Sequence, residues 1–160
     1  MVKKILIIII ILAIFNLFQY NFTNKLLQFI SDQETDIRYD FQTNLNRAII
    51  EIDEFIETKD MRHLGAVAIE LREATGRVTN YRQNFLKDDW PVYSNLASLF
   101  SSVRTDISSY DESADSNIDL ISLSEGLKYL LENKDVVYYG STDEFRQLID
   151  RLQLLIYNNS

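Results

Sequence analysis

The amino-terminal segment most limits what this chain can fold into, because it contains an unbroken apolar run from Ile5 to Phe15. Apolar residues continue as far as Phe22, interrupted only by asparagine and glutamine. A helix rises about 1.5 Å per residue, so a helix from Val2 to Phe22 would span roughly 30 Å, the thickness of a bilayer's hydrocarbon layer. We therefore predict a transmembrane signal anchor over residues 5–22.

Two alternatives compete for this segment: a secretory signal that is cleaved, and a helix buried in a protein core. Lys3 and Lys4, which precede the run, suit a signal peptide as well as an anchor. Cleavage needs small residues at a defined spacing after the run, and the sequence FNLFQY at residues 15–20 offers none. The length and the flanks favour an anchor that stays uncleaved.

Charge gives the anchor a direction. Two lysines lie on its short amino-terminal side, whereas the first charges beyond it are Lys25 and then three acidic residues. Because Lys and Arg accumulate on the cytoplasmic side of a membrane, residues 1–4 are predicted to be cytoplasmic and the bulk of the chain extracytoplasmic. Residues 23–36 would form a membrane-proximal neck, and residues 37–160 a separate domain.

The composition of residues 23–160 excludes several classes of function. Two of the 16 basic residues and none of the 24 acidic residues precede residue 23, which leaves a formal charge of −10 beyond it. Such a surface repels phosphate backbones, so we predict no nucleic-acid binding. The chain has no cysteine, and so it has no disulfide, thiolate metal site or thiol nucleophile. The lack of disulfides favours a bacterial cell envelope.

The pattern of turn residues and apolar residues predicts an all-α chain. The sequence has four glycines and one proline, and none of them precedes Leu64. Apolar residues recur at intervals of three and four, typical of amphipathic helices, and alternating strand patterns are absent over useful lengths. We predict an antiparallel bundle of four to five helices over residues 37–160. Their apolar stripes begin at Ile37, Leu64, Leu96, Leu120 and Phe145.

The ends of these helices follow from short polar segments. SDQETD at residues 31–36 has nothing to bury; we predict that the helix continues through it, the alternative being a new start at a Ser31–Glu34 capping box. Residues 58–60 interrupt the pattern and predict a turn. The stretch KDVVYYGSTDE is predicted to be a link, within which Ser141 and Glu144 form a capping box for the last helix.

Charge also predicts how the first two bundle helices pair. The first is acidic and the second carries several arginines. Folding the chain back near residue 59 brings Arg82 level with Asp36 and Arg77 level with Asp40. Exposed ion pairs contribute only about 0–1 kcal/mol, so these pairs would set register more than stability.

No group of residues indicates catalysis, a metal site or a cofactor site. The calcium-loop spacing that begins at Asp115 fails, because Leu120 stands where a glycine is needed and Gly126 where a bidentate glutamate is needed. His63 is the only histidine, and we interpret it as a solvated residue at a helix start. Glycine-rich phosphate loops and a glycine-flanked serine nucleophile are also absent.

Aromatic residues near predicted helix ends are the best candidates for partner contact. Flat rings with polar tips can bind a sugar, a peptide or a partner helix, and they can equally cap the end of a core. We predict that VVYY at residues 136–139 is exposed and forms the main contact patch. The candidate contact residues are Trp90, Tyr93, Val136, Val137, Tyr138 and Tyr139.

Two hypotheses for function follow. The first is a non-enzymatic, single-pass envelope protein whose bundle holds a partner protein or another copy of itself. The second is an extracytoplasmic ligand-sensing bundle. Bacterial receptors with such bundles carry a second span and a cytoplasmic output domain, which this sequence lacks, so a sensor of this kind would signal through a membrane partner. An envelope enzyme is a third class, for which the sequence offers no catalytic group.

Overall fold

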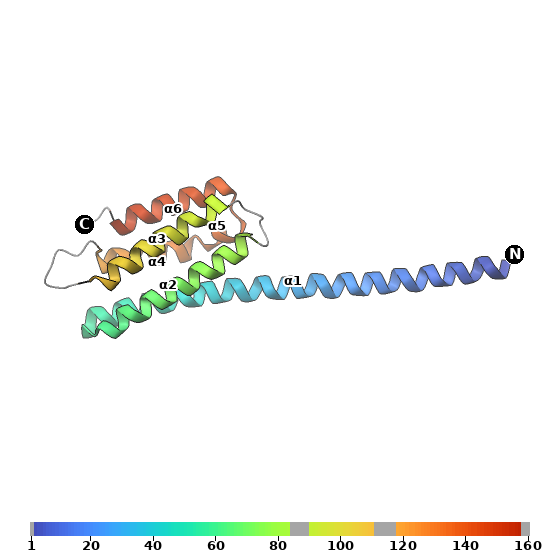
Figure 1. The fold of residues 1–160 in the computed structure, drawn as a ribbon, viewed down its shortest axis with the longest axis horizontal. Helices are drawn as coiled ribbons and strands as arrows, with labels where there is room; N and C mark the ends of the chain where they lie inside the picture. The colour runs from blue at the N-terminus through green and yellow to red at the C-terminus, as the bar shows by residue number, and fades with distance from the viewer. Residues whose placement is uncertain (1, 84–89, 111–117, 158–160) are drawn as a thin grey trace. The chain divides into compact units, whose positions relative to one another are not determined.

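The computed structural model describes residues 2–83, 90–110 and 118–157, and it describes their side chains except at 2–11 and 90–93. Over these residues the regular structure consists of six α-helices, which confirms the prediction of an all-α chain. The chain divides into two units, Met1–Asp36 and Ile37–Ser160. Figure 1 shows the order of the helices along the chain.

The first helix, α1, runs from Val2 to Thr58. Its backbone stays helical through SDQETD, so the predicted continuity is confirmed and the restart at Ser31 is wrong. The physical reason is that neither glycine nor proline interrupts the backbone there. Inside the segment, the Thr35 hydroxyl donates to the Ser31 carbonyl at 2.9 Å, as a helical residue can.

The described side chains of α1 in the first unit are largely exposed. Every residue from Leu12 to Ile30 is exposed, and eleven of these are large apolar side chains. Within the described part of the chain, no helix is long and apolar enough to cross a membrane. The side chains of residues 5–11, which belong to the predicted span, lie outside that part.

The second unit is a helical bundle with one apolar core, as the sequence pattern predicts, but its described residues form six helical segments instead of the predicted four to five, because the short helix α5 forms. It contains the end of α1 and the helices α2 (Met61–Tyr81), α3 (Trp90–Ser108), α4 (Leu120–Glu132), α5 (Lys134–Tyr139) and α6 (Thr142–Tyr157). Helix α2 packs on α3, and α6 packs on α3, α4 and α5 (Figure 1). The residues that the core buries most completely include Phe41, Leu45, Ile52, Val67, Leu71, Phe100, Val103, Leu127, Phe145 and Leu152.

The turn between α1 and α2 lies at the predicted place. Lys59 takes a left-handed conformation with φ 60° and donates its N–H to the Phe55 carbonyl at 2.8 Å, which ends α1. Asp60 then caps α2 by accepting from the Arg62 N–H at 3.0 Å. The hydrogen bonds from Arg62 lower the pKa of Asp60 to about 2.

The beginning of α6 confirms the capping box. The Ser141 hydroxyl and backbone N–H donate to the Glu144 carboxylate at 2.8 Å and 2.7 Å, and the Glu144 N–H donates to the Ser141 hydroxyl at 3.3 Å. These bonds lower the pKa of Glu144. The helix then packs closely on α4 at Gly126, where a Cβ atom would lie 2.9 Å from the Ile156 side chain.

The structure corrects the prediction that KDVVYYGSTDE, residues 134–144, is a link between helices. The segment KDVVYY forms a short helix that buries Val137 and Tyr138 in the core. The Tyr138 hydroxyl donates to the Arg38 carbonyl at 3.0 Å, and burial raises the pKa of Tyr138, so this hydroxyl keeps its proton. The sequence pattern does not reveal this helix because its burial depends on partners from α1 and α2.

Candidate functional site

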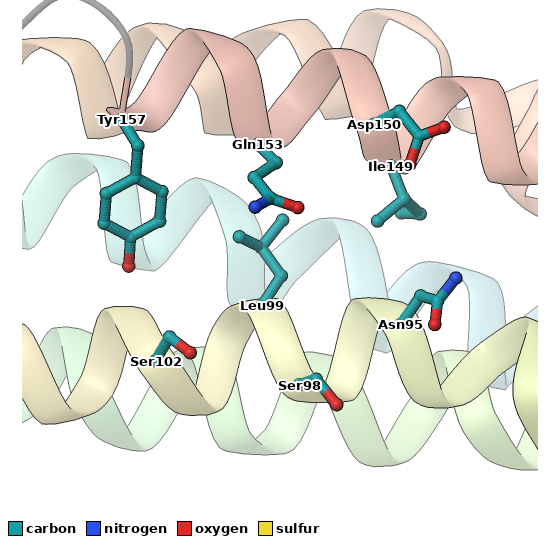
Figure 2. Close-up of a pocket in the computed structure, with 8 residues that line it drawn as sticks. All are labelled: Asn95, Ser98, Leu99, Ser102, Ile149, Asp150, Gln153 and Tyr157. Carbon is teal, nitrogen blue, oxygen red and sulfur yellow. The ribbon is translucent and has the colours of Figure 1, made fainter.

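A groove in the described part of the bundle lies between α3 and α6. It encloses about 330 Å³. Figure 2 shows α3 and α6 side by side, with Gln153 directed toward Leu99 and Tyr157 directed toward α3. Leu99 and Ile149 are buried beneath polar side chains. The lining residues are Asn95, Ser98, Leu99 and Ser102 from α3 and Ile149, Asp150, Gln153 and Tyr157 from α6.

Helical spacing explains why these side chains share a groove. Asn95, Ser98 and Ser102 are three and four residues apart, so they lie on one face of α3. Asp150, Gln153 and Tyr157 repeat the same spacing on α6. The apolar residues next to these polar stripes hold the two helices together, and the polar stripes form the rim.

A hydrogen bond fixes the Tyr157 side chain at one end of the groove. Its hydroxyl donates to the Asp106 carboxylate at 2.7 Å. Burial and the neighbouring carboxylate both raise the pKa of Tyr157, so the hydroxyl stays protonated at neutral pH. The hydrogen bond links the end of α6 to α3 and fixes the position of the ring.

The chemistry of the groove suits recognition more than reaction. Its eight lining residues offer amides, hydroxyls and one exposed carboxylate, with no histidine, cysteine, lysine or arginine among them. These groups can exchange hydrogen bonds with a polar, uncharged ligand, and they contain no nucleophile paired with a base. Among the residues that the structure describes, no three His, Asp or Glu side chains gather as metal ligands would.

The structure describes the side chains of four of the six predicted contact residues. Trp90 and Tyr93 belong to α3, but their side chains lie outside the described residues. Tyr139 is exposed and Val136 is half-buried. The prediction that residues 136–139 form one exposed patch is wrong for Val137 and Tyr138, because both lie in the core.

The predicted ion pairs concern the packing of α1 on α2. The structure places the Arg77 guanidinium 3.0 Å from the Asp40 carboxylate, and both side chains are partly exposed. Arg47 and Glu70 lie 3.9 Å apart with the same antiparallel offset. Asp36 belongs to the first unit, so its pairing with Arg82 stays a prediction.

Arg82 is buried completely, which the sequence analysis did not predict. Its guanidinium donates to the Val137 carbonyl at 2.9 Å and to the Gly140 carbonyl at 3.3 Å, and it lies 4.0 Å from the centre of the Phe145 ring. It therefore satisfies carbonyls at the end of α5, where a helix leaves acceptors unpaired. Its position in the sequence could have predicted this burial, because Arg82 follows the buried residue Val78 by four positions and so continues the apolar face of α2.

His63 also has a partner that the sequence analysis missed. Its Nδ1 lies 2.7 Å from the Glu51 carboxylate, and both side chains are about one-third exposed. The pair joins α1 to α2 near their connecting turn. The antiparallel offset of the Arg77–Asp40 pair would have placed Glu51 within about one helical turn of His63.

Comparison with known proteins adds no relative. No family model matches the chain, and neither the curated proteins nor the solved structures give a match.

Proposed function

We propose that the chain is a non-enzymatic, single-pass membrane protein whose bundle acts as an interaction or assembly module in a bacterial cell envelope. Residues 5–22 would cross the membrane with residues 1–4 in the cytoplasm. Residues 23–36 would form the neck, and residues 37–160 would lie outside the cytoplasm. The proposal rests chiefly on the apolar surface of residues 12–30, which nothing within the first unit covers.

The size of that surface supports the proposal. Soluble monomers rarely expose contiguous apolar patches larger than a few hundred Å². Here large apolar side chains are exposed on all sides of the helix between Leu12 and Phe22, as lipid contact requires. The apolar run that begins at Ile5 extends the same pattern toward the two amino-terminal lysines.

The mechanism would be positional. An anchor confines the bundle to a layer next to the membrane, and confinement raises its effective concentration toward other membrane components. The formal charge of −10 beyond residue 22 would repel anionic lipid head groups and so hold the bundle off the surface.

Carbonate extraction of membranes from bacteria that express the full chain tests the proposal. We expect the wild-type protein in the membrane pellet and the double variant Leu12→Glu, Phe15→Glu largely in the supernatant, because each charge in a span costs about 3 kcal/mol. Leu154→Glu is the matched control, since Leu154 is an exposed apolar residue of the bundle. Release of the wild-type chain would refute the proposal.

A second candidate function, ligand sensing, draws support from the α3–α6 groove. The groove offers hydrogen-bonding groups above an apolar floor and holds a constrained tyrosine. Thermal shift with a panel of small sugars and amino acids would test this function. A ligand that stabilises the wild-type chain but not Gln153→Ala would favour sensing over assembly.

A further inference from the structure

We propose that two copies of this chain pair in parallel along one face of α1, through a seam formed by residues 12–33. The inference rests on the proposed function, because anchors in one membrane share an orientation. It goes further by naming the partner, a second copy, and the contact residues. The seam consists of Leu12, Phe15, Gln19, Phe22, Leu26, Phe29 and Gln33.

The spacing of the seam is that of a coiled coil. Its residues are separated by alternating steps of three and four, the a and d positions of a heptad repeat, over three heptads. Its apolar members are all exposed in the first unit, Leu12 at 55% and Phe29 at 60%. The neighbouring frame that starts at Phe15 would instead place Lys25 and Asp32 at the contact.

The neck gives the strongest reason for a protein partner. Leu26, Leu27, Phe29 and Ile30 are exposed and lie toward one side of the helix. If the span ends at Phe22, these residues lie roughly 6–12 Å beyond the hydrocarbon layer, where lipid chains no longer cover them. A neck that served only as a spacer would have no need of an apolar face.

The two glutamines of the seam favour a second copy over an unrelated partner. Gln19 interrupts an apolar stretch, and an amide in such surroundings needs both a donor and an acceptor. In a parallel symmetric pair each residue faces its own copy, so Gln19 and Gln33 would each meet an identical amide at the same height. Polar residues at single a positions are known to set register and the number of strands.

The seam also ends where pairing must end. Continuing the same frame beyond Gln33 places Asp36 and then Asp40 at the contact positions. Like charges facing each other would oppose pairing there. The proposed contact is therefore confined to the first unit.

Oxidative crosslinking of single-cysteine variants tests the pairing directly, because the chain contains no cysteine of its own. Leu26→Cys and Phe29→Cys lie in the seam, whereas Gln28→Cys and Ser31→Cys, on the same stretch of α1, lie outside it. Each full-length variant is expressed in bacterial membranes, oxidised with copper phenanthroline and separated on a non-reducing gel. A disulfide requires Cβ atoms about 4 Å apart, so only seam positions should link efficiently.

We expect at least about fivefold more disulfide-linked dimer for the two seam variants than for the two outer variants. Equal linking at all four positions, or no dimer at the seam, would overturn the proposal. Adducts of another mass at Leu26→Cys would overturn the choice of a second copy as partner. Misfolding of the bundle cannot explain a difference in disulfide yield between the seam and outer variants, because all four substitutions lie outside residues 37–160.

A second measurement addresses the glutamine. In the Phe29→Cys background, Gln19→Leu should reduce the dimer about two- to fivefold through loss of the interhelical hydrogen bond, whereas Asn16→Leu, outside the seam, should not. An unchanged amount of disulfide-linked dimer in Gln19→Leu would contradict the proposed hydrogen bond between the Gln19 amides of the two copies.

Carbonate extraction of the same samples separates this inference from the proposed function. If carbonate releases the protein but the cysteines at positions 26 and 29 still link selectively, the membrane anchor is refuted and the pairing along the seam is supported. If the protein stays in the membrane and no position links selectively, the anchor is supported and the pairing along the seam is refuted.

Discussion

The two units of this chain differ in how far they bury their apolar side chains. Residues 37–160 bury phenylalanines and leucines against one another, and Phe41 and Phe145 have no exposed surface. Residues 12–30 expose the same residue types, Phe18 at 68%. The sequence supplies helix formers in both units, so secondary structure alone does not distinguish them. The difference indicates that the second unit is stabilised by its own apolar core, whereas residues 12–30 form no such core within the first unit.

The same substitution in the two units should separate them most clearly. Phe41→Ala removes a ring that has no exposed surface and lies edge-on to Tyr138, so we expect a loss of about 3–5 kcal/mol in unfolding free energy. Phe29→Ala should change the unfolding of the bundle by less than about 0.5 kcal/mol. Urea titration of the full chain in mild detergent, followed by circular dichroism, measures both. Similar losses of unfolding free energy in the two variants would contradict the conclusion that only the second unit is stabilised by burial of its apolar side chains.

The next largest loss of unfolding free energy is expected on replacing Arg82, which is buried in the bundle. Arg82→Ala leaves the carbonyls of Val137 and Gly140 without this donor and removes the cation over Phe145, so we expect a loss of about 3 kcal/mol. Arg77→Ala, which breaks the partly exposed ion pair with Asp40, should cost at most about 1 kcal/mol. Arg82→Lys should recover part of the loss. Equal effects at the two arginines would show that burial of Arg82 contributes nothing.

Close packing within the bundle should depend on Gly126. A valine there would place side-chain carbons against Ile156 and Leu152, so we expect a loss of about 1–3 kcal/mol in thermal unfolding. Gly76→Val is the matched control, because nothing lies within 4 Å of a Cβ at that position. The control should be neutral within about 0.5 kcal/mol. A well-tolerated Gly126→Val would mean that α4 and α6 can separate at no cost.

The smallest effect concerns a helix cap and depends on pH. Asp119 accepts from the Ser122 hydroxyl at 2.7 Å and from the Ile121 N–H at 3.1 Å, and these bonds lower its pKa. A lowered pKa stabilises the fold fully above the unfolded value near 3.8, and this contribution disappears as the pH falls through the lower folded value. Asp119→Ala should cost about 1 kcal/mol at pH 7.

Melting temperatures measured at pH 7 and pH 2.5 test whether the contribution of Asp119 to stability falls in acid. The difference in melting temperature between wild type and Asp119→Ala should be smaller at pH 2.5 than at pH 7. Asp53→Ala, at an exposed position within α1, serves as control and should show no gap at pH 7. A gap that widens in acid would contradict the direction of the pKa shift.

Local patterns predicted most of the helical structure of the bundle. The stripes that begin at Ile37, Leu64 and Leu120 correspond to helices, and the capping box at Ser141 forms as expected, because spacing and capping act within a few residues. Helix α5 and the burial of Arg82 escaped prediction for one shared reason. Each depends on the other across the fold, and no local pattern records a contact between residues 55 positions apart.

The groove between α3 and α6 escaped prediction for a related reason. Its serine and amide residues read as the solvated face of each helix taken alone. They became a candidate site only when packing placed the two faces side by side. The exposed apolar surface of residues 12–30, by contrast, follows directly from the sequence, since it involves a single helix.

Labelling of single cysteines with a water-soluble maleimide tests most directly whether something outside the chain covers the first unit. Phe18→Cys and Ser98→Cys both replace residues that are exposed in the structure. In intact bacteria we expect Ser98→Cys to react and Phe18→Cys to react at least about tenfold more slowly, with equal rates after denaturation in detergent. Equal rates in intact cells would show that water reaches Phe18 freely and that neither membrane nor partner covers this helix.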